Sequence, residues 1–199
     1  MLDSNLTFQK QIKKTVGSVK RNLRQFRYIR DQLSTEAAKT YLHSFILLHL
    51  SYCVTTWSQA NKTTKKPLST LYKQALKVFD KKPNNFHHCE IIRKHDLLTL
   101  DNFLMMANVC LIYRILNGLA PPPFDKFVTR NSGRRATRAS SRGDCSLNFR
   151  TTKFSRTAFS IQAAGQWNSL PVEIRNCDSF KGFKFALKRF LRGGQVCGH

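Results

Sequence analysis

Four side chains with metal-binding chemistry lie close together in the middle of the chain. His87, His88 and Cys89 are consecutive, and His95 follows His88 by seven positions. A seven-residue step returns to the same face of a helix, and imidazole and thiolate are ligands that zinc prefers. However, the stretch contains no Cys-x-x-Cys pair and no His-x(3–5)-His pair to complete a tetrahedral set. We therefore favour a short packed helix around Cys89 and Ile92, without a metal or other cofactor.

Acidic side chains are too few and too scattered to predict catalysis. The chain has 11 Asp and Glu against 34 Lys and Arg, and no two aspartates are adjacent. Metal-dependent and general acid–base catalysis need acidic groups or nucleophile–base pairs in defined proximity. The sequence contains no recognisable carboxylate dyad, nucleophile–base pair or glycine-rich phosphate loop. We expect a protein that is not an enzyme.

The charge balance indicates a polyanionic partner. The formal net charge is +23 over 199 residues, and such a charge attracts RNA or DNA through the phosphate backbone. An anionic membrane surface is the less favoured alternative. Two apolar stretches are read as core helices: Phe45–Leu48 is too short to span a bilayer, and Phe103–Leu119 is interrupted by Asn108 and Arg114.

Cysteine usage points to an intracellular protein, in the nucleus or the cytoplasm. Six cysteines are scattered without paired spacing, at positions 53, 89, 110, 145, 177 and 197. The N-terminus shows no secretory signal, so we expect six reduced thiols.

The first basic cluster lies on a predicted helix at residues 5–30. Apolar residues step by three or four along one face: Phe8, Ile12, Val16, Val19, Leu23 and Phe26. The opposite face and its flank carry the candidate phosphate-binding residues Lys10, Lys13, Lys14, Lys20, Arg21 and Arg24. No acid lies between Lys10 and Arg30, whereas solvated surfaces usually mix both signs. The pattern favours a phosphate-facing stripe over an ordinary solvated helix surface.

A second basic segment follows in the C-terminal half. Asn131–Asp144 has no large apolar residue and cannot form a core by itself. It is either a solvated linker or a basic arm that clamps phosphates. The candidate contacts of this arm are Arg134, Arg135, Arg138, Arg142, Arg150, Lys153 and Arg156.

Further helices must position these clusters. Ser34 is the expected N-cap of a helix over 35–52, which forms a hairpin with the first and buries Ala38, Tyr41, Leu42, Phe45, Ile46, Leu48 and Tyr52. A helix is predicted over 64–79, with Pro67 in its first turn. Its inward-facing residues are Leu68, Leu71, Tyr72, Ala75, Leu76 and Phe79. A central helix from 101 or 102 to about 117 ends at Asn117-Gly118. The prolines at 121–123 then mark a domain boundary.

The C-terminal part is built around a tryptophan. Trp167-Asn168-Ser169-Leu170-Pro171 ends one element, because Pro171 lacks an amide hydrogen, and Trp167 is the expected buried anchor. Ser179 is the expected N-cap of a last helix with Phe180, Phe183, Leu187, Phe190 and Leu191 at helical spacing. Leu147, Phe149, Thr151 and Phe154 suggest one or two short strands before it.

The Trp167–Pro171 motif, Ile174-Arg175 and the following Phe-x-x-x-Leu-Lys helix resemble the C-terminal tail of reverse transcriptases from LINE-type (non-LTR, jockey-like) retrotransposons of animals. Other segments resemble the same family in the same order, so the resemblance runs over nearly the whole chain. They are Leu2-Asp3 with Leu6-Thr7-Phe8, Tyr52-Cys53 before Trp57, Leu71-Tyr72 with Ala75-Leu76-Lys77, His87-His88-Cys89, and Tyr113–Gly118 before Pro121-Pro122.

The resemblance implies the region downstream of the polymerase palm. The family's polymerase uses paired aspartates, usually in a Phe/Tyr-Ala-Asp-Asp turn, to hold two magnesium ions, and this chain lacks them and the family's endonuclease. We expect a mainly α fold: a thumb-like helical domain (1–120), a basic linker or arm (121–155) and a small α+β C-terminal packing unit (156–199). The implied function is a non-catalytic nucleic-acid-binding fragment, with the rest of such a polymerase as a second partner. The alternative is an inert remnant of a decayed element.

Overall fold

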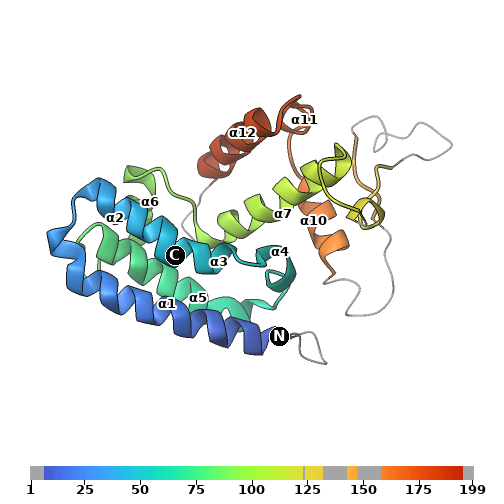
Figure 1. Cartoon of the computed structure of the whole chain (residues 1–199). Helices are drawn as coiled ribbons and strands as arrows, with labels where there is room; N and C mark the ends of the chain where they lie inside the picture. Colours follow the sequence, from blue (N-terminus) through green and yellow to red (C-terminus); the bar gives the residue numbers. More distant parts are fainter. Residues whose placement is uncertain (1–6, 123, 132–142, 148–157, 195–199) are drawn as a thin grey trace. The chain divides into compact units, whose positions relative to one another are not determined.

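A computed structural model describes residues 7–122, 124–131, 143–147 and 158–194 (Figure 1). The predicted mainly α class is confirmed. Within these ranges no β-strand occurs, and the one β-bridge joins Arg130 to Cys145 in antiparallel sense. The chain divides into two compact units, one within Met1–Leu100 and the other within Asp101–Gln195. Each unit is a separate set of packed helices.

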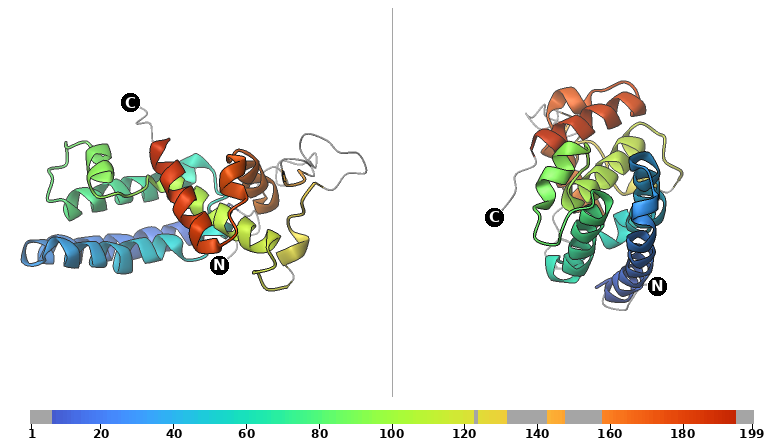
Figure 2. Two further views of the ribbon diagram at one scale, coloured as in Figure 1. Left: turned by 90° about the horizontal axis from the view of Figure 1, so that it is seen from above. Right: turned by 90° about the vertical axis from the view of Figure 1, so that its left-hand side faces the viewer.

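The first unit opens with the predicted helical hairpin. Helix α1 (Gln9–Ile29) is followed by the 3-10 turn η1 (Arg30–Gln32), and a second rod runs back through α2 (Thr35–Tyr41), η2 (Leu42–Leu47) and α3 (Leu48–Ser51). The two rods lie antiparallel, side by side, in Figures 1 and 2. The N-cap assigned from the sequence is confirmed, since Ser34 Oγ accepts a hydrogen bond from the Ala37 amide at 3.2 Å.

Helix α1 buries four of the six apolar residues that its spacing predicts to face inward, whereas Phe8 and Val16 are half-buried. Its buried residues are Ile12, Thr15, Val19, Leu23 and Phe26, and it packs on α3, η2 and α5. The helix begins at Gln9 rather than at residue 5, because Phe8 adopts a left-handed conformation with φ 58°.

The second rod differs from the prediction because η2 is a π-helical turn. Such a turn holds one extra residue, which rotates all later side chains by roughly 100° about the axis. Leu42 and Ile46 stay buried as expected, but Leu47 and Leu50 replace the expected Leu48. The prediction was therefore wrong for three residues, which are exposed: Phe45, Leu48 and Tyr52.

Helix α5 (Lys62–Phe79) completes the core of the first unit. It follows the short helix α4 (Val54–Trp57), and its N-cap is Asn61, whose side chain accepts from the Thr64 amide at 2.7 Å. The six residues predicted to face inward are all buried. Because the helix starts at Lys62, Pro67 lies beyond the first turn.

A small polar cluster closes the end of α5. The Asp80 carboxylate accepts hydrogen bonds from His95 Nε2 at 2.6 Å and from Lys94 Nζ at 2.8 Å, at the end of α6 (His88–Lys94). Burial raises the pKa of Asp80, but the hydrogen bonds and charges of Lys94 and His95 outweigh it, and the net pKa lies below its ordinary value.

In the second unit, α7 (Leu100–Leu116) contacts α10 (Phe159–Asn168), where Asn108 Nδ2 donates to Gln166 Oε1 at 3.2 Å, and α12 (Phe180–Gly193). The Tyr113 ring stacks on Phe183 at 4.3 Å, and Asn102 Nδ2 donates to the Leu191 carbonyl at 2.9 Å. Helix α7 is thus grouped with the C-terminal half, so the division falls before the predicted boundary at 121. Gly118, with φ 66°, ends the helix as expected.

The Trp-Asn motif fastens α10 to the segment around Cys145. Trp167 is buried, as predicted, and its Nε1 donates to the Gly143 carbonyl at 3.4 Å. The Asn168 amide acts like a neighbouring strand: it accepts from the Cys145 N–H at 2.7 Å and donates to the Cys145 carbonyl at 3.0 Å. A buried ion pair of 2.6 Å joins Asp144 to Arg175 of α11 (Val172–Arg175) beside it.

The remaining C-terminal predictions have mixed outcomes. Ser179 caps α12 by accepting from the Gly182 amide at 3.1 Å, but Phe190, expected to face inward, is exposed. Leu147 lies in no strand, and Phe149, Thr151 and Phe154 lie outside the described residues. The 3-10 turn η3 (Phe124–Lys126) follows the proline run. An α+β character of this unit is therefore not shown.

We expect Asp80→Asn to lower the free energy of unfolding by about 1–3 kcal/mol near neutral pH, because it removes two charged hydrogen bonds. Since the folded pKa is depressed, this stabilisation is complete above about pH 4 and is lost as the pH falls through the folded value. Urea unfolding at several pH values measures it. Asp31→Asn is the control, since the Asp31–Lys81 pair of 3.1 Å is exposed. Equal losses in both variants would contradict the prediction.

We expect Asn168→Ala to destabilise the second unit by about 2–3 kcal/mol, because both backbone groups of Cys145 lose their side-chain partner. Asn176→Ala, at an exposed position, is the control and should change stability by less than about 0.5 kcal/mol. Chemical unfolding followed by tryptophan fluorescence in a Trp57→Phe background, which leaves Trp167 as the reporter, measures both. An unchanged midpoint for Asn168→Ala would refute this role.

Candidate nucleic-acid interface

The structure brings the six predicted basic residues of α1 onto one outward surface. Lys10, Lys13, Lys14, Lys20, Arg21 and Arg24 are all exposed, and Arg27 is exposed beside them. We call these seven residues the basic stripe. Its central line runs Lys10, Lys14, Gly17, Arg21 and Arg24, at alternating steps of four and three that keep one direction on an α-helix.

The stripe has a single sign of charge. No acid occurs within Gln9–Ile29, and none of the seven cations forms an ion pair with any residue that the structure describes. Arg21 makes only a 3.3 Å hydrogen bond to Ser18. Neighbouring cations repel one another across such a surface, and a bound polyanion would relieve that repulsion.

Two residues near the stripe have other roles. Arg30 is buried, and it donates from Nε to the Phe79 carbonyl at 2.7 Å and from a terminal nitrogen to the Leu33 carbonyl at 3.0 Å. It ties the hairpin turn to the end of α5 and is structural. A Cβ at Gly17 would meet no atom within 4 Å, so the packing of the protein does not require glycine there.

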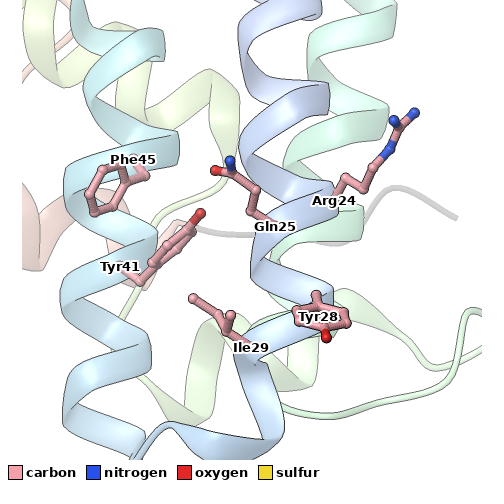
Figure 3. Close-up of a pocket in the computed structure, with 6 residues that line it drawn as sticks. All are labelled: Arg24, Gln25, Tyr28, Ile29, Tyr41 and Phe45. Carbon is pink, nitrogen blue, oxygen red and sulfur yellow. The ribbon is translucent and has the colours of Figure 1, made fainter.

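An open pocket adjoins the C-terminal end of the stripe. It has a volume of about 580 Å³ and lies between α1 and the α2–η2 rod (Figure 3). Its lining is Arg24, Gln25, Tyr28, Ile29, Tyr41 and Phe45. The sequence did not reveal it, because Tyr41 and Phe45 were assigned to the core. Tyr28 was an available signal, since it follows Arg24 by four positions on the outward line.

The predicted arm lies outside the described residues. This applies to Arg134, Arg135, Arg138, Arg142, Arg150, Lys153 and Arg156. The described residues beside it, Thr129–Asn131 and Asp144–Ser146, are joined by two backbone hydrogen bonds of 2.9 Å.

The histidine–cysteine stretch is a poor zinc site. The ligand atoms of His87, His88 and Cys89 lie within 4.8 Å of one another, but Cys89 is disulfide-bonded and offers no thiolate. Burial, with the positive charges of Lys73, His87 and Lys77, lowers the pKa of His88 to about 4. A cationic surrounding also disfavours a metal cation, and His95 binds Asp80 instead.

The cysteines depart from the expected six reduced thiols. Cys53, Cys110, Cys145 and Cys177 are free, whereas Cys89 is disulfide-bonded. Burial raises the pKa of Cys110 and of Cys145 to about 11, so neither is a reactive thiolate at neutral pH.

Two further findings bear on the class of protein. Among the described helices, none combines the length and the apolar character needed to cross a bilayer. No protein-family model matches the sequence, and no match emerges from the curated proteins or from the solved structures. The basic stripe is therefore the feature of the chain that points to a function.

Proposed function

We propose that this chain is a non-catalytic nucleic-acid-binding fragment of a LINE-type retroelement RNA-directed DNA polymerase, which contacts the phosphates of template–primer or element RNA. The observation that carries the proposal is the stripe on α1: seven exposed cations on one helix with no acidic residue among them. The proposed retroelement origin rests on the collinear motifs from Leu2-Asp3 to Trp167–Pro171 and the helix that follows.

The dimensions of α1 suit such a contact. From Lys10 to Arg24 the helix rises by roughly 21 Å, at 1.5 Å per residue. A duplex carries one charge per about 1.7 Å of axis, so this length faces enough phosphates for some 5–8 contacts. The hydrophobic contacts of α1 with α5 and η2 keep the cations in a fixed row, which lowers the entropy cost of binding.

The chain would act inside the cell, in the nucleus or the cytoplasm, and the rest of the polymerase would be its second partner. Catalysis would belong to that partner, because no acidic pair occurs in this sequence. An inert remnant of a decayed element is the competing hypothesis, and it predicts no selective contact by the stripe.

Affinity for a short duplex should fall steeply with salt, with a slope of log affinity against log salt of roughly −4 to −7. Replacing three stripe residues (Lys10→Gln, Lys14→Gln, Arg21→Gln) should make the slope shallower by about 2.5–3, because each lost phosphate contact removes about 0.9. Fluorescence anisotropy titrations at several salt concentrations measure both quantities.

The matched control replaces three exposed lysines of α5 (Lys62→Gln, Lys66→Gln, Lys73→Gln), which removes the same charge elsewhere in the first unit. It should lower affinity only slightly. Equal effects of the two triple variants would mean that net charge, rather than the stripe, binds nucleic acid. A shallow slope for the unaltered chain would refute the proposal.

A second prediction concerns chemistry. With magnesium, nucleotides and a primer–template that the chain binds, we expect no incorporation, because two-metal catalysis needs paired carboxylates that the sequence lacks. A gel-based extension assay, with an active reverse transcriptase as positive control, tests it. Any extension of the primer by the purified chain would overturn the non-catalytic assignment.

A further inference from the structure

We propose that the pocket beside Tyr28 is a stacking site for one unpaired base of a single-stranded nucleic acid whose phosphates follow the basic stripe. This inference rests on the proposed function and specifies its ligand. Tyr28 is 84% exposed and continues the line of Arg21 and Arg24, so an aromatic face stands where the row of cations ends. Proteins that bind single-stranded nucleic acid without sequence preference combine a row of cations for the phosphates with aromatic rings on which the bases stack.

The opposite wall of the pocket is the outer part of an aromatic stack. The buried Phe26 ring stacks on Tyr41 at 4.6 Å with an interplanar angle of 9°. Tyr41 in turn stacks on Phe45 at 4.7 Å and 30°, and Phe45 is 50% exposed. Figure 3 shows Tyr41 and Phe45 on the second rod, Gln25 and Ile29 of α1 facing them across the seam, and Tyr28 on the outer edge of α1 beside Arg24. The lining of the pocket therefore includes aromatic side chains from both helices.

Two hydrogen bonds to Asn22 hold Tyr41 and the backbone of Phe45 in place before any ligand arrives. Asn22 Nδ2 donates to the Phe45 carbonyl at 2.6 Å, and the Tyr41 hydroxyl donates to the Asn22 carbonyl at 3.1 Å. Phe45 lies within the π-helical turn η2, which turns it outward instead of into the core. A π-turn weakens a helix locally and is frequent at functional sites. Here it gives the second rod its exposed aromatic ring.

The charge and size of the pocket select the occupant. Its six lining residues include no acid, and Arg24 offers a guanidinium that can bind a phosphate or stack on a base. Gln25 adds an amide for the edge of a base. A volume of about 580 Å³ lies within the range of small-ligand pockets and admits one base with its sugar. The bases of a duplex are already stacked and cannot enter.

The test compares a single-stranded oligonucleotide of about 12 nucleotides, carrying 2-aminopurine, with a blunt duplex of equal length. Tyr28→Ala should weaken single-strand binding roughly 5- to 100-fold and should change duplex affinity less than about twofold. The salt slope should stay the same, because no cation is lost. Tyr28→Phe should retain single-strand affinity. Stacking on Tyr28 should quench the 2-aminopurine fluorescence when the unaltered chain binds, and this quenching should be lost in Tyr28→Ala.

Tyr52→Ala is the matched control, since Tyr52 is 68% exposed in the same unit and does not line the pocket. Circular dichroism checks that each variant folds. The stacking site is refuted if Tyr28→Ala leaves single-strand affinity unchanged, or if it lowers the affinity for single strand and duplex equally. In that case a steep salt dependence of duplex affinity would still support the proposed function. If the unaltered chain binds neither ligand, both proposals fail together. Capture of an apolar peptide in place of the single strand would also refute this inference.

Discussion

Burial of one face of α1 is the constraint on which the first unit depends. Val19, Leu23 and Phe26 are almost completely removed from water against α5 and the second rod. Each such side chain contributes about 1.5–3 kcal/mol on burial, far more than the repulsion between exposed, hydrated cations costs. The apolar contacts therefore fix the rotation of the helix about its axis. The basic residues, which lie on the opposite face of the helix, must then point outward.

The π-turn in η2 is the second feature that determines how the first unit packs. Leu42 and Ile46 continue the buried line of α2, and the extra residue then moves that line to Leu47 and Leu50. The core remains continuous, while Phe45 is released to the surface at the seam with α1. A single inserted residue thus keeps the packing of the rod and creates the aromatic wall of the pocket.

The second unit is held by polar contacts as much as by apolar ones. Asn168 satisfies both backbone groups of Cys145, and the buried Asp144–Arg175 pair lies beside it. Unmet polar groups at such depth would cost several kcal/mol, so these partners fix which segment packs on α10. This gives the Trp-Asn motif a physical role: the tryptophan fills the core and the asparagine replaces a missing neighbouring strand.

The sequence by itself determined the long helices α1, α5, α7 and α12, the caps at Ser34 and Ser179, the inward face of α5 and the basic outer face of α1. These follow from local periodicity and from side chains that bond to backbone within a turn. Only the tertiary structure decided the π-turn, the exposure of Phe45 and Phe190, the pairing of Asn168 with Cys145 and the disulfide state of Cys89. Those features depend on which distant segments meet, and helical spacing along one segment holds no information about its neighbours.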